Sequence, residues 1–120
     1  MWPQIRLAVL LVLTLVGCAP SISDPLASEL AGQSKPLLAS GCHSPPRTVG
    51  AEEWPASVAS LQPKHVYVSD AGLEITTRSF FASSWGVFIP CDPNSFAPVP
   101  GNDPAYTQVG PGVYTYYIAG

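Results

Sequence analysis

Charged side chains are scarce in this sequence. Asp, Glu, Lys and Arg make up 11% of its 120 residues, against about a quarter in typical globular proteins. Five residues are Lys or Arg, and no two of them are adjacent. Proteins bind nucleic acid and anionic lipid through clustered basic side chains, so we predict neither as a charge-driven partner.

Motifs of the common enzyme classes are also missing. The chain contains no GxSxG, HExxH or CxxC motif and no glycine-rich phosphate loop. Its two histidines, His43 and His65, offer little for general acid–base catalysis. We therefore predict that the protein is not an enzyme and that it uses no cofactor.

A long apolar run lies near the start of the chain. Residues 7–16 are apolar apart from Thr14, and Arg6 is the one charge before them. Ten such residues are too few for a membrane-spanning helix, which needs about 20. The run also lacks the polar face of a surface helix. A basic start followed by a short apolar core is typical of an export signal.

This signal ends in Leu15-Val16-Gly17-Cys18, which is an aliphatic residue, a tolerant position, a small residue and a cysteine. The four residues resemble the lipobox of bacterial lipoproteins. The resemblance implies cleavage after Gly17, a diacylglyceryl thioether on Cys18 and acylation of the new amino terminus by chains such as palmitate. Two or three acyl chains hold a protein stably on a bilayer, whereas one does so marginally.

The resemblance also implies where the mature protein resides. It implies a cell-envelope protein that is anchored to the membrane through Cys18 and faces the periplasm or the exterior. Ala19 follows the cysteine in place of aspartate, which favours the outer membrane where the organism has one.

Composition divides the chain into three parts. Residues 1–17 are the predicted signal peptide. Residues 18–40 are rich in Ser, Ala and Pro and lack aromatics, which predicts a flexible tether. Within it, Asp24 and Pro25 fit the start of one short helix. Residues 41–120 then form a single small domain.

Aromatic residues and period-two alternation mark the core of this domain. Ten of the twelve Phe, Trp and Tyr residues lie between Tyr67 and Tyr117. Alternating or continuously apolar segments predict five strands, at residues 65–69, 73–78, 85–89, 106–109 and 113–118. The four prolines of residues 91–104 predict a surface loop, and Pro55 predicts a short helix up to Leu61.

Together these elements predict a mainly β fold, or a β-rich α+β fold. It is a small antiparallel sheet of about five strands with one or two short helices. Gly72 is predicted as the left-handed residue of a three-residue hairpin turn. In the strand that follows, alternation predicts that Leu73 and Ile75 face inward and that Glu74 and Thr76 face solvent.

Two cysteines remain once Cys18 is assigned to lipid. Cys42 and Cys91 are an even pair in an exported chain, which predicts a disulfide. The alternative is a zinc site formed with the adjacent His43 and Asp92. Zinc sites usually show closely spaced ligand pairs, and adjacent residues of an extended segment point to opposite sides. We therefore predict no metal site.

The last predicted strand is rich in tyrosine. Tyr114 and Tyr116 share one face and Tyr117 lies on the other. Tyrosine rings suit protein or glycan contacts, so these three residues are candidates for a contact surface. The alternative is that both rows pack inside the domain.

Taken together, the sequence favours a small lipid-anchored envelope protein with a structural or partner-binding role. Its partner is unknown and is predicted to be another envelope protein. The alternative is a tethered module that binds a small molecule or a glycan.

The lipid anchor is testable by substitution. Cys18→Ala removes the thiol that would carry the lipid, so we expect processing to stop and the full-length precursor to accumulate. Intact-mass measurement of the membrane fraction reports both changes, and Ser21→Ala is the matched control outside the motif. Normal cleavage and release of the Cys18→Ala chain would show that the protein is not a lipoprotein.

Overall fold

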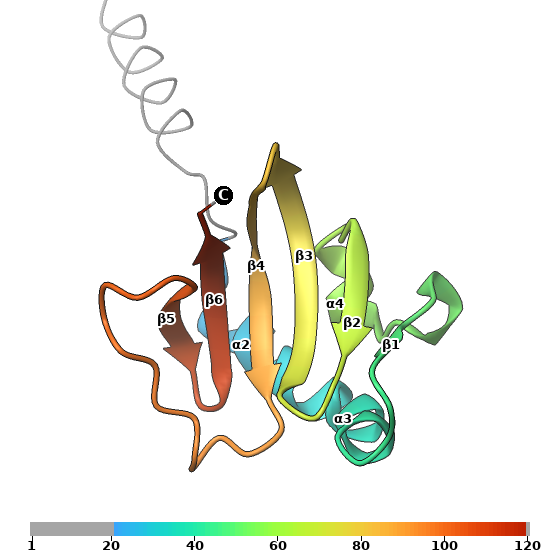
Figure 1. Ribbon diagram of the computed structural model, residues 1–120. Helices are drawn as coiled ribbons and strands as arrows, with labels where there is room; N and C mark the ends of the chain where they lie inside the picture. The colour runs from blue at the N-terminus through green and yellow to red at the C-terminus, as the bar shows by residue number, and fades with distance from the viewer. Residues whose placement is uncertain (1–20, 120) are drawn as a thin grey trace, which may run out of the picture.

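The computed structural model describes residues 21–119 and forms two layers. A six-stranded antiparallel sheet with strand order β1-β2-β3-β4-β6-β5 is one layer, and the helices lie on one of its faces (Figure 1). The strands are β1 (Arg47–Thr48), β2 (His65–Val68), β3 (Gly72–Phe80), β4 (Ser83–Pro90), β5 (Ala105–Gly110) and β6 (Val113–Ile118). The helices are α2 (Asp24–Gln33), α3 (Lys35–Gly41), α4 (Ala56–Ser60) and the 3-10 turn η1 (Ala51–Glu53).

The predicted mainly β fold is confirmed. All five predicted strands are present, and so are the helix after Pro55 and the surface loop of residues 91–104. The sixth strand, β1, has only two residues, which is too short to show an alternating pattern. The signal peptide of residues 1–17 and Cys18 lie outside the described residues. No helix described between residues 21 and 119 is long and apolar enough to cross a membrane.

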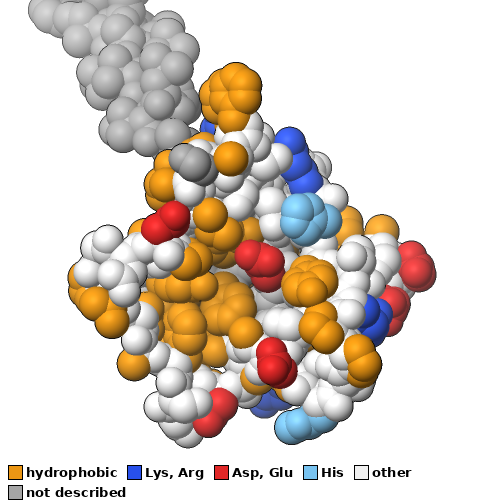
Figure 2. Space-filling view, in the orientation of Figure 1, with side chains coloured by type: hydrophobic (Ala, Val, Ile, Leu, Met, Phe, Trp, Pro, Cys, Tyr) orange, Lys and Arg blue, Asp and Glu red, His pale blue; other side chains and the backbone are white. Residues whose placement is uncertain are grey.

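The hydrophobic core fills the space between the sheet and the helices. Alternate residues of the central strands face the helices, and the face turned to the viewer in Figures 1 and 2 carries no helix. Fully burying each large aliphatic side chain contributes about 1.5–3 kcal/mol. The fully buried members of this core are Leu30, Val49, Val58, Val66, Val68, Leu73, Ile75, Val87 and Val113.

The prediction of a flexible tether over residues 18–40 is wrong for the part that the structure describes. Ser23, rather than Asp24, caps α2 and accepts a hydrogen bond from the Leu26 N–H at 3.3 Å. From there α2 and α3 pack on the sheet. Their buried residues repeat at spacings of three and four, which is a helical stripe; they are Ala27, Leu30, Ser34, Leu37 and Gly41.

The turn between β2 and β3 also differs from the prediction. The Ser69 N–H donates to the Gly72 carbonyl at 3.0 Å, and Gly72 is the buried first residue of β3 instead of a turn residue. Its φ is positive as predicted, at 156°, a value that residues with a side chain rarely adopt. A Cβ at Gly72 would lie 2.8 Å from both the Phe88 ring and the Pro90 Cα. Glycine is therefore needed here because β4 approaches closely.

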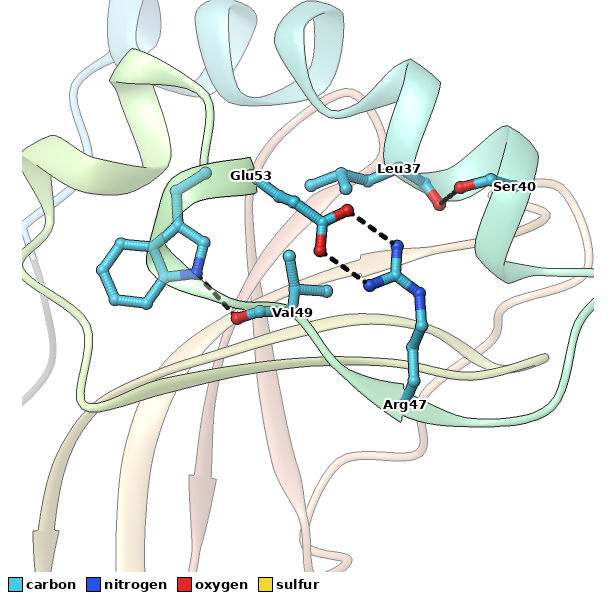
Figure 3. A network of polar contacts seen from close by, with 6 residues as sticks. Leu37, Ser40, Arg47, Val49 and Glu53 are labelled. Carbon is cyan, nitrogen blue, oxygen red and sulfur yellow. Dashed lines mark hydrogen bonds and ion pairs between the residues drawn. The ribbon is translucent and has the colours of Figure 1, made fainter.

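Side-chain contacts hold the segment around β1 (Figure 3). The Arg47 guanidinium donates two hydrogen bonds to the Glu53 carboxylate at 3.0 and 3.2 Å, and these bonds lower the pKa of Glu53. The Trp54 Nε1 donates to the Val49 carbonyl at 3.0 Å. Since Val49 is buried, this bond ties the partly exposed indole to the core.

Both edges of the sheet are short or interrupted. At one edge, β1 pairs only through Arg47 and Thr48. At the other, the register of β5 shifts between Gln108 and Gly110. Pro111 follows at once and has no backbone N–H to donate.

The predicted disulfide is confirmed. Cys42 and Cys91 are bonded, with their Cα atoms 6.0 Å apart and 49 positions between them in sequence. Cys42 is the C-cap of α3, and Cys91 directly follows β4. The bond therefore joins the helical layer to the end of a central strand.

Loss of this bond should destabilise the domain strongly. Closing a loop of this length removes denatured-state entropy worth about 4 kcal/mol, out of a total stability of about 5–15 kcal/mol. We expect the double variant Cys42→Ser, Cys91→Ser to lower the melting temperature by roughly 15 °C or more, measured by circular dichroism. An unchanged melting temperature would show that the crosslink does not stabilise the fold.

Candidate functional site

The sheet face opposite the helices, called the open face here, carries the candidate site. A cleft of about 410 Å³ lies on it between the turn after β2 and the loop of residues 91–104. In Figure 2, hydrophobic side chains gather over the left part of this face, and acidic side chains lie around them.

Strand register brings the cleft residues together. Tyr67 pairs with Glu74, Glu74 with Phe88, and Phe88 with Tyr114. Directly paired residues point to the same face of a sheet. These four side chains therefore form one row across β2, β3, β4 and β6, although they span almost 50 positions of sequence.

One side of the cleft is formed by a wall of four packed aromatic rings, of which three, Phe88, Phe96 and Tyr106, line the cleft. Phe96, from the loop after β4, packs its ring 5.2 Å from Phe88, 5.0 Å from Tyr106 and 4.9 Å from Tyr114, measured between centroids. Tilted and edge-on aromatic pairs at these distances are favourable. The contacts between these rings therefore fix the wall without a bound ligand.

The floor of the open face depends on a glycine. Gly86 of β4 lies between Thr76 and Tyr116 in register. A Cβ at Gly86 would lie 2.7 Å from the Tyr116 ring and would clash with the Ile75 carbonyl oxygen. Without that Cβ, the tyrosine crosses β4 and its hydroxyl lies 2.7 Å from the Thr76 hydroxyl. Burial raises the pKa of Tyr116 to about 12.

The same bond corrects the prediction that Thr76 faces solvent. Thr76 does point to the open face, but Tyr116 covers it and leaves it 2% exposed. The two-residue alternation of a strand predicts the face to which a side chain points. It does not predict which residue from a distant strand will cover that side chain.

The charge of the cleft is entirely acidic. Asp70, Glu74 and Asp92 are among the residues that line it, and no described Lys, Arg or His is. The Asp92 carboxylate is occupied, since it accepts from the Asn94 N–H at 3.1 Å and the Ser95 hydroxyl at 2.8 Å.

Glu74 differs from Asp92 because its carboxylate is unpaired. Within residues 21–119 it has no hydrogen-bond or ion-pair partner, although it is partly buried between aromatic neighbours. Its negative charge adds to the effect of burial in raising the pKa of Tyr106 and of Tyr116. The cleft thus contains a carboxylate that has no counterion among residues 21–119.

The three tyrosines predicted as a contact surface do not form one surface. Tyr114 and Tyr116 lie on the open face but are buried, and of the three only Tyr116 lines the cleft. Tyr117 lies on the opposite face, 37% exposed, with its ring centroid 5.1 Å from that of Trp85. The sequence analysis did not select Tyr67, Glu74, Phe88, Phe96 or Tyr106, which lie in or near predicted strands.

Other parts of the described chain, residues 21–119, offer no comparable arrangement of reactive side chains. Among the described residues, no three or more His, Cys, Asp or Glu side chains converge as metal ligands. A second hollow of about 450 Å³ lies beside the Cys42–Cys91 bond, with Lys35 and His43 as its ionisable residues. Both are exposed and neither is held over it by a hydrogen bond, so the cleft on the open face remains the candidate.

No protein-family model matches this chain, and no curated protein or solved structure shows significant similarity to it.

Burial of the Tyr116 hydroxyl, which bonds with Thr76, predicts a measurable pH effect. Tyr116→Phe should cost about 1–3 kcal/mol at pH 7, because a buried threonine hydroxyl loses its partner. The tyrosine pKa is about 12 in the fold against 10.0 as the ordinary value. The unfolded chain therefore loses this proton first, and the stabilisation falls as pH rises from about 10 to 12, by about 1.4 kcal/mol per pH unit.

Urea unfolding of wild type and variant at pH 7 and at pH 10 to 11 tests this effect. The difference in unfolding free energy between wild type and Tyr116→Phe should be smaller at the higher pH. Adding Thr76→Val to Tyr116→Phe should cost less than the sum of the two single changes. A difference that is constant with pH would contradict the burial of the Tyr116 hydroxyl, and fully additive costs would contradict its coupling to Thr76.

Proposed function

We propose that this protein is a lipid-anchored component of the bacterial cell envelope whose domain binds a cationic group of a partner protein. The Leu15-Val16-Gly17-Cys18 resemblance supports the anchor. The cleft on the open face supports the binding role. Lysine or arginine side chains of an envelope protein are the ligands with the matching chemistry.

The unpaired Glu74 carboxylate is the observation that carries the binding proposal. A carboxylate that is partly buried beside aromatic rings attracts a cation more strongly than one surrounded by water. The neighbouring rings of Tyr67 and Phe88 add cation–π attraction, worth about 0.5–2 kcal/mol. Asp70 lies at the rim and adds negative charge, which raises the rate at which a cationic partner arrives.

The proposal contains no catalytic step. Among the described residues that line the cleft there is no histidine, and Cys91 is bonded to Cys42. The acidic residues present bind and orient, and no nucleophile is paired with a base as covalent catalysis requires.

The alternative is a tethered module for a small cationic molecule. The cleft volume of about 410 Å³ lies within the usual range of small-molecule sites, about 300–1,000 Å³. A small molecule that stays bound during purification and appears in native mass spectra would favour this alternative. A neutral sugar would stack on Tyr67 but would leave the Glu74 charge unpaired, so it fits less well.

A charge-specific binding measurement tests the proposal. A capped peptide with one central lysine should shift the backbone amide resonances of Tyr67, Glu74 and Phe88 in NMR titrations. Glu74→Gln keeps the shape of the side chain and removes its charge. We therefore expect the dissociation constant of the lysine peptide for this variant to be on the order of tenfold higher, or more, than for wild type. Glu29→Gln, on the exposed surface of α2 across the sheet, is the matched control and should leave binding unchanged.

A second peptide separates charge from apolar contact. Norleucine in place of the lysine keeps the chain length but carries no charge. Equal binding of the two peptides to wild type, or no shift with either, would overturn the cationic-partner proposal. Stronger binding of the lysine peptide that disappears in Glu74→Gln would support it.

A further inference from the structure

The β3–β4 hairpin ends in two exposed aromatic residues. Phe80 is 62% exposed and Phe81 is 93% exposed, and their rings pack edge-on with centroids 4.4 Å apart. In Figure 1 this hairpin extends beyond the rest of the sheet at its upper end. A pair of large apolar side chains at such a position favours contact with another apolar phase.

The fold itself does not explain these residues. Phe80 pairs with Ser83, so residues 81 and 82 form a two-residue turn, a position where Asn-Gly is preferred. Phe81 has a φ of 53°, in the left-handed region that asparagine and glycine tolerate better. An exposed phenylalanine there costs backbone energy and buries nothing in the core.

The β3–β4 hairpin near its tip, with the Lys64 that contacts it, has the composition of a membrane-interface segment. Arg78 lies over the Trp85 ring at 5.6 Å, and Lys64 donates to Ser79 at 3.3 Å. Residues 75–91 contain no Asp or Glu. Arg, Lys and Trp place apolar parts in a bilayer and polar ends at its surface, whereas a carboxylate would oppose insertion.

The length of chain before α2 limits where a membrane can lie. The described structure is folded from Ser23 onward. Four residues lie between Cys18 and Ser23, and the five steps from one Cα to the other span roughly 17 Å at most. The described chain begins behind the upper part of β6, at the end of the sheet from which the hairpin tip projects (Figure 1). A lipid on Cys18 would therefore hold this end of the domain close to the bilayer.

We propose that Phe80 and Phe81 insert into the bilayer interface beside the acylated Cys18 and form a second membrane contact. This inference rests on the lipid anchor of the proposed function. Two contacts at one end fix the orientation of the domain, with its strands standing away from the membrane. The open face and its cleft then face along the membrane plane, toward neighbouring envelope proteins.

Photo-crosslinking in intact cells tests this second contact. Phe81 is replaced by the photo-reactive aromatic p-benzoyl-phenylalanine, and the full chain is irradiated in its native membrane and analysed by intact mass. Asn94 is the matched control position. It is exposed and follows the far end of β4, about 25 Å of strand away from the tip.

The expected result is a phospholipid adduct at position 81, at least fivefold more abundant than at position 94. The same spectra report whether Cys18 carries lipid. Suppose that Cys18 is lipidated but position 81 carries no lipid adduct, or carries a protein adduct instead. This result would overturn the insertion of the tip and would still support the lipid anchor. A chain without lipid on Cys18 and without adduct overturns both.

A folding measurement separates insertion from structure. Phe81→Asn places a residue suited to the left-handed conformation at the turn. We expect it to melt at the same temperature as wild type or higher, since Phe81 packs on nothing in the core. A clear loss of stability would show that Phe81 serves the fold, which would overturn the argument for insertion.

Discussion

The packing of α2 and α3 against one face of the sheet is the interaction on which the other features depend. It buries a helical stripe that includes Leu30 and Leu37 and gives the sheet its core. The Cys42–Cys91 bond then locks the end of this helical layer to the end of β4. Because the three short helices cover only one face of the sheet, the opposite face has no helical layer on it.

That open face is organised by aromatic packing and one hydrogen bond instead of a second layer. Phe96 reaches over from a proline-rich loop to complete a four-ring wall. Tyr116 crosses Gly86 to bond with Thr76. These contacts stabilise the face and leave Glu74 beside aromatic rings, with no hydrogen-bond or ion-pair partner among residues 21–119, which is the arrangement on which the proposed binding role rests.

Sequence patterns predicted the parts of this fold that depend on neighbouring residues. Alternation located five strands, and the count of cysteines in an exported chain indicated the disulfide. A short helix starting at Asp24 and Pro25 was predicted, but the packing of residues 24–41 on the sheet was missed because two positions of the buried stripe are Ser34 and Gly41, which carry no hydrophobic signal. The cleft was missed because it requires the register of four strands, and no local pattern contains the pairing of Glu74 with Phe88 or of Phe88 with Tyr114.

The form of the two sheet edges would matter if the proposed lipid anchor confines the protein to a membrane surface. Attachment to a membrane concentrates copies of a chain in two dimensions, and uncovered strand edges then favour pairing between molecules and aggregation. Here one edge offers only the two residues of β1, and the other is interrupted by the register shift between Gln108 and Gly110, with Pro111 directly after it. Neither edge presents a long regular ladder, so copies crowded on one membrane can remain separate molecules.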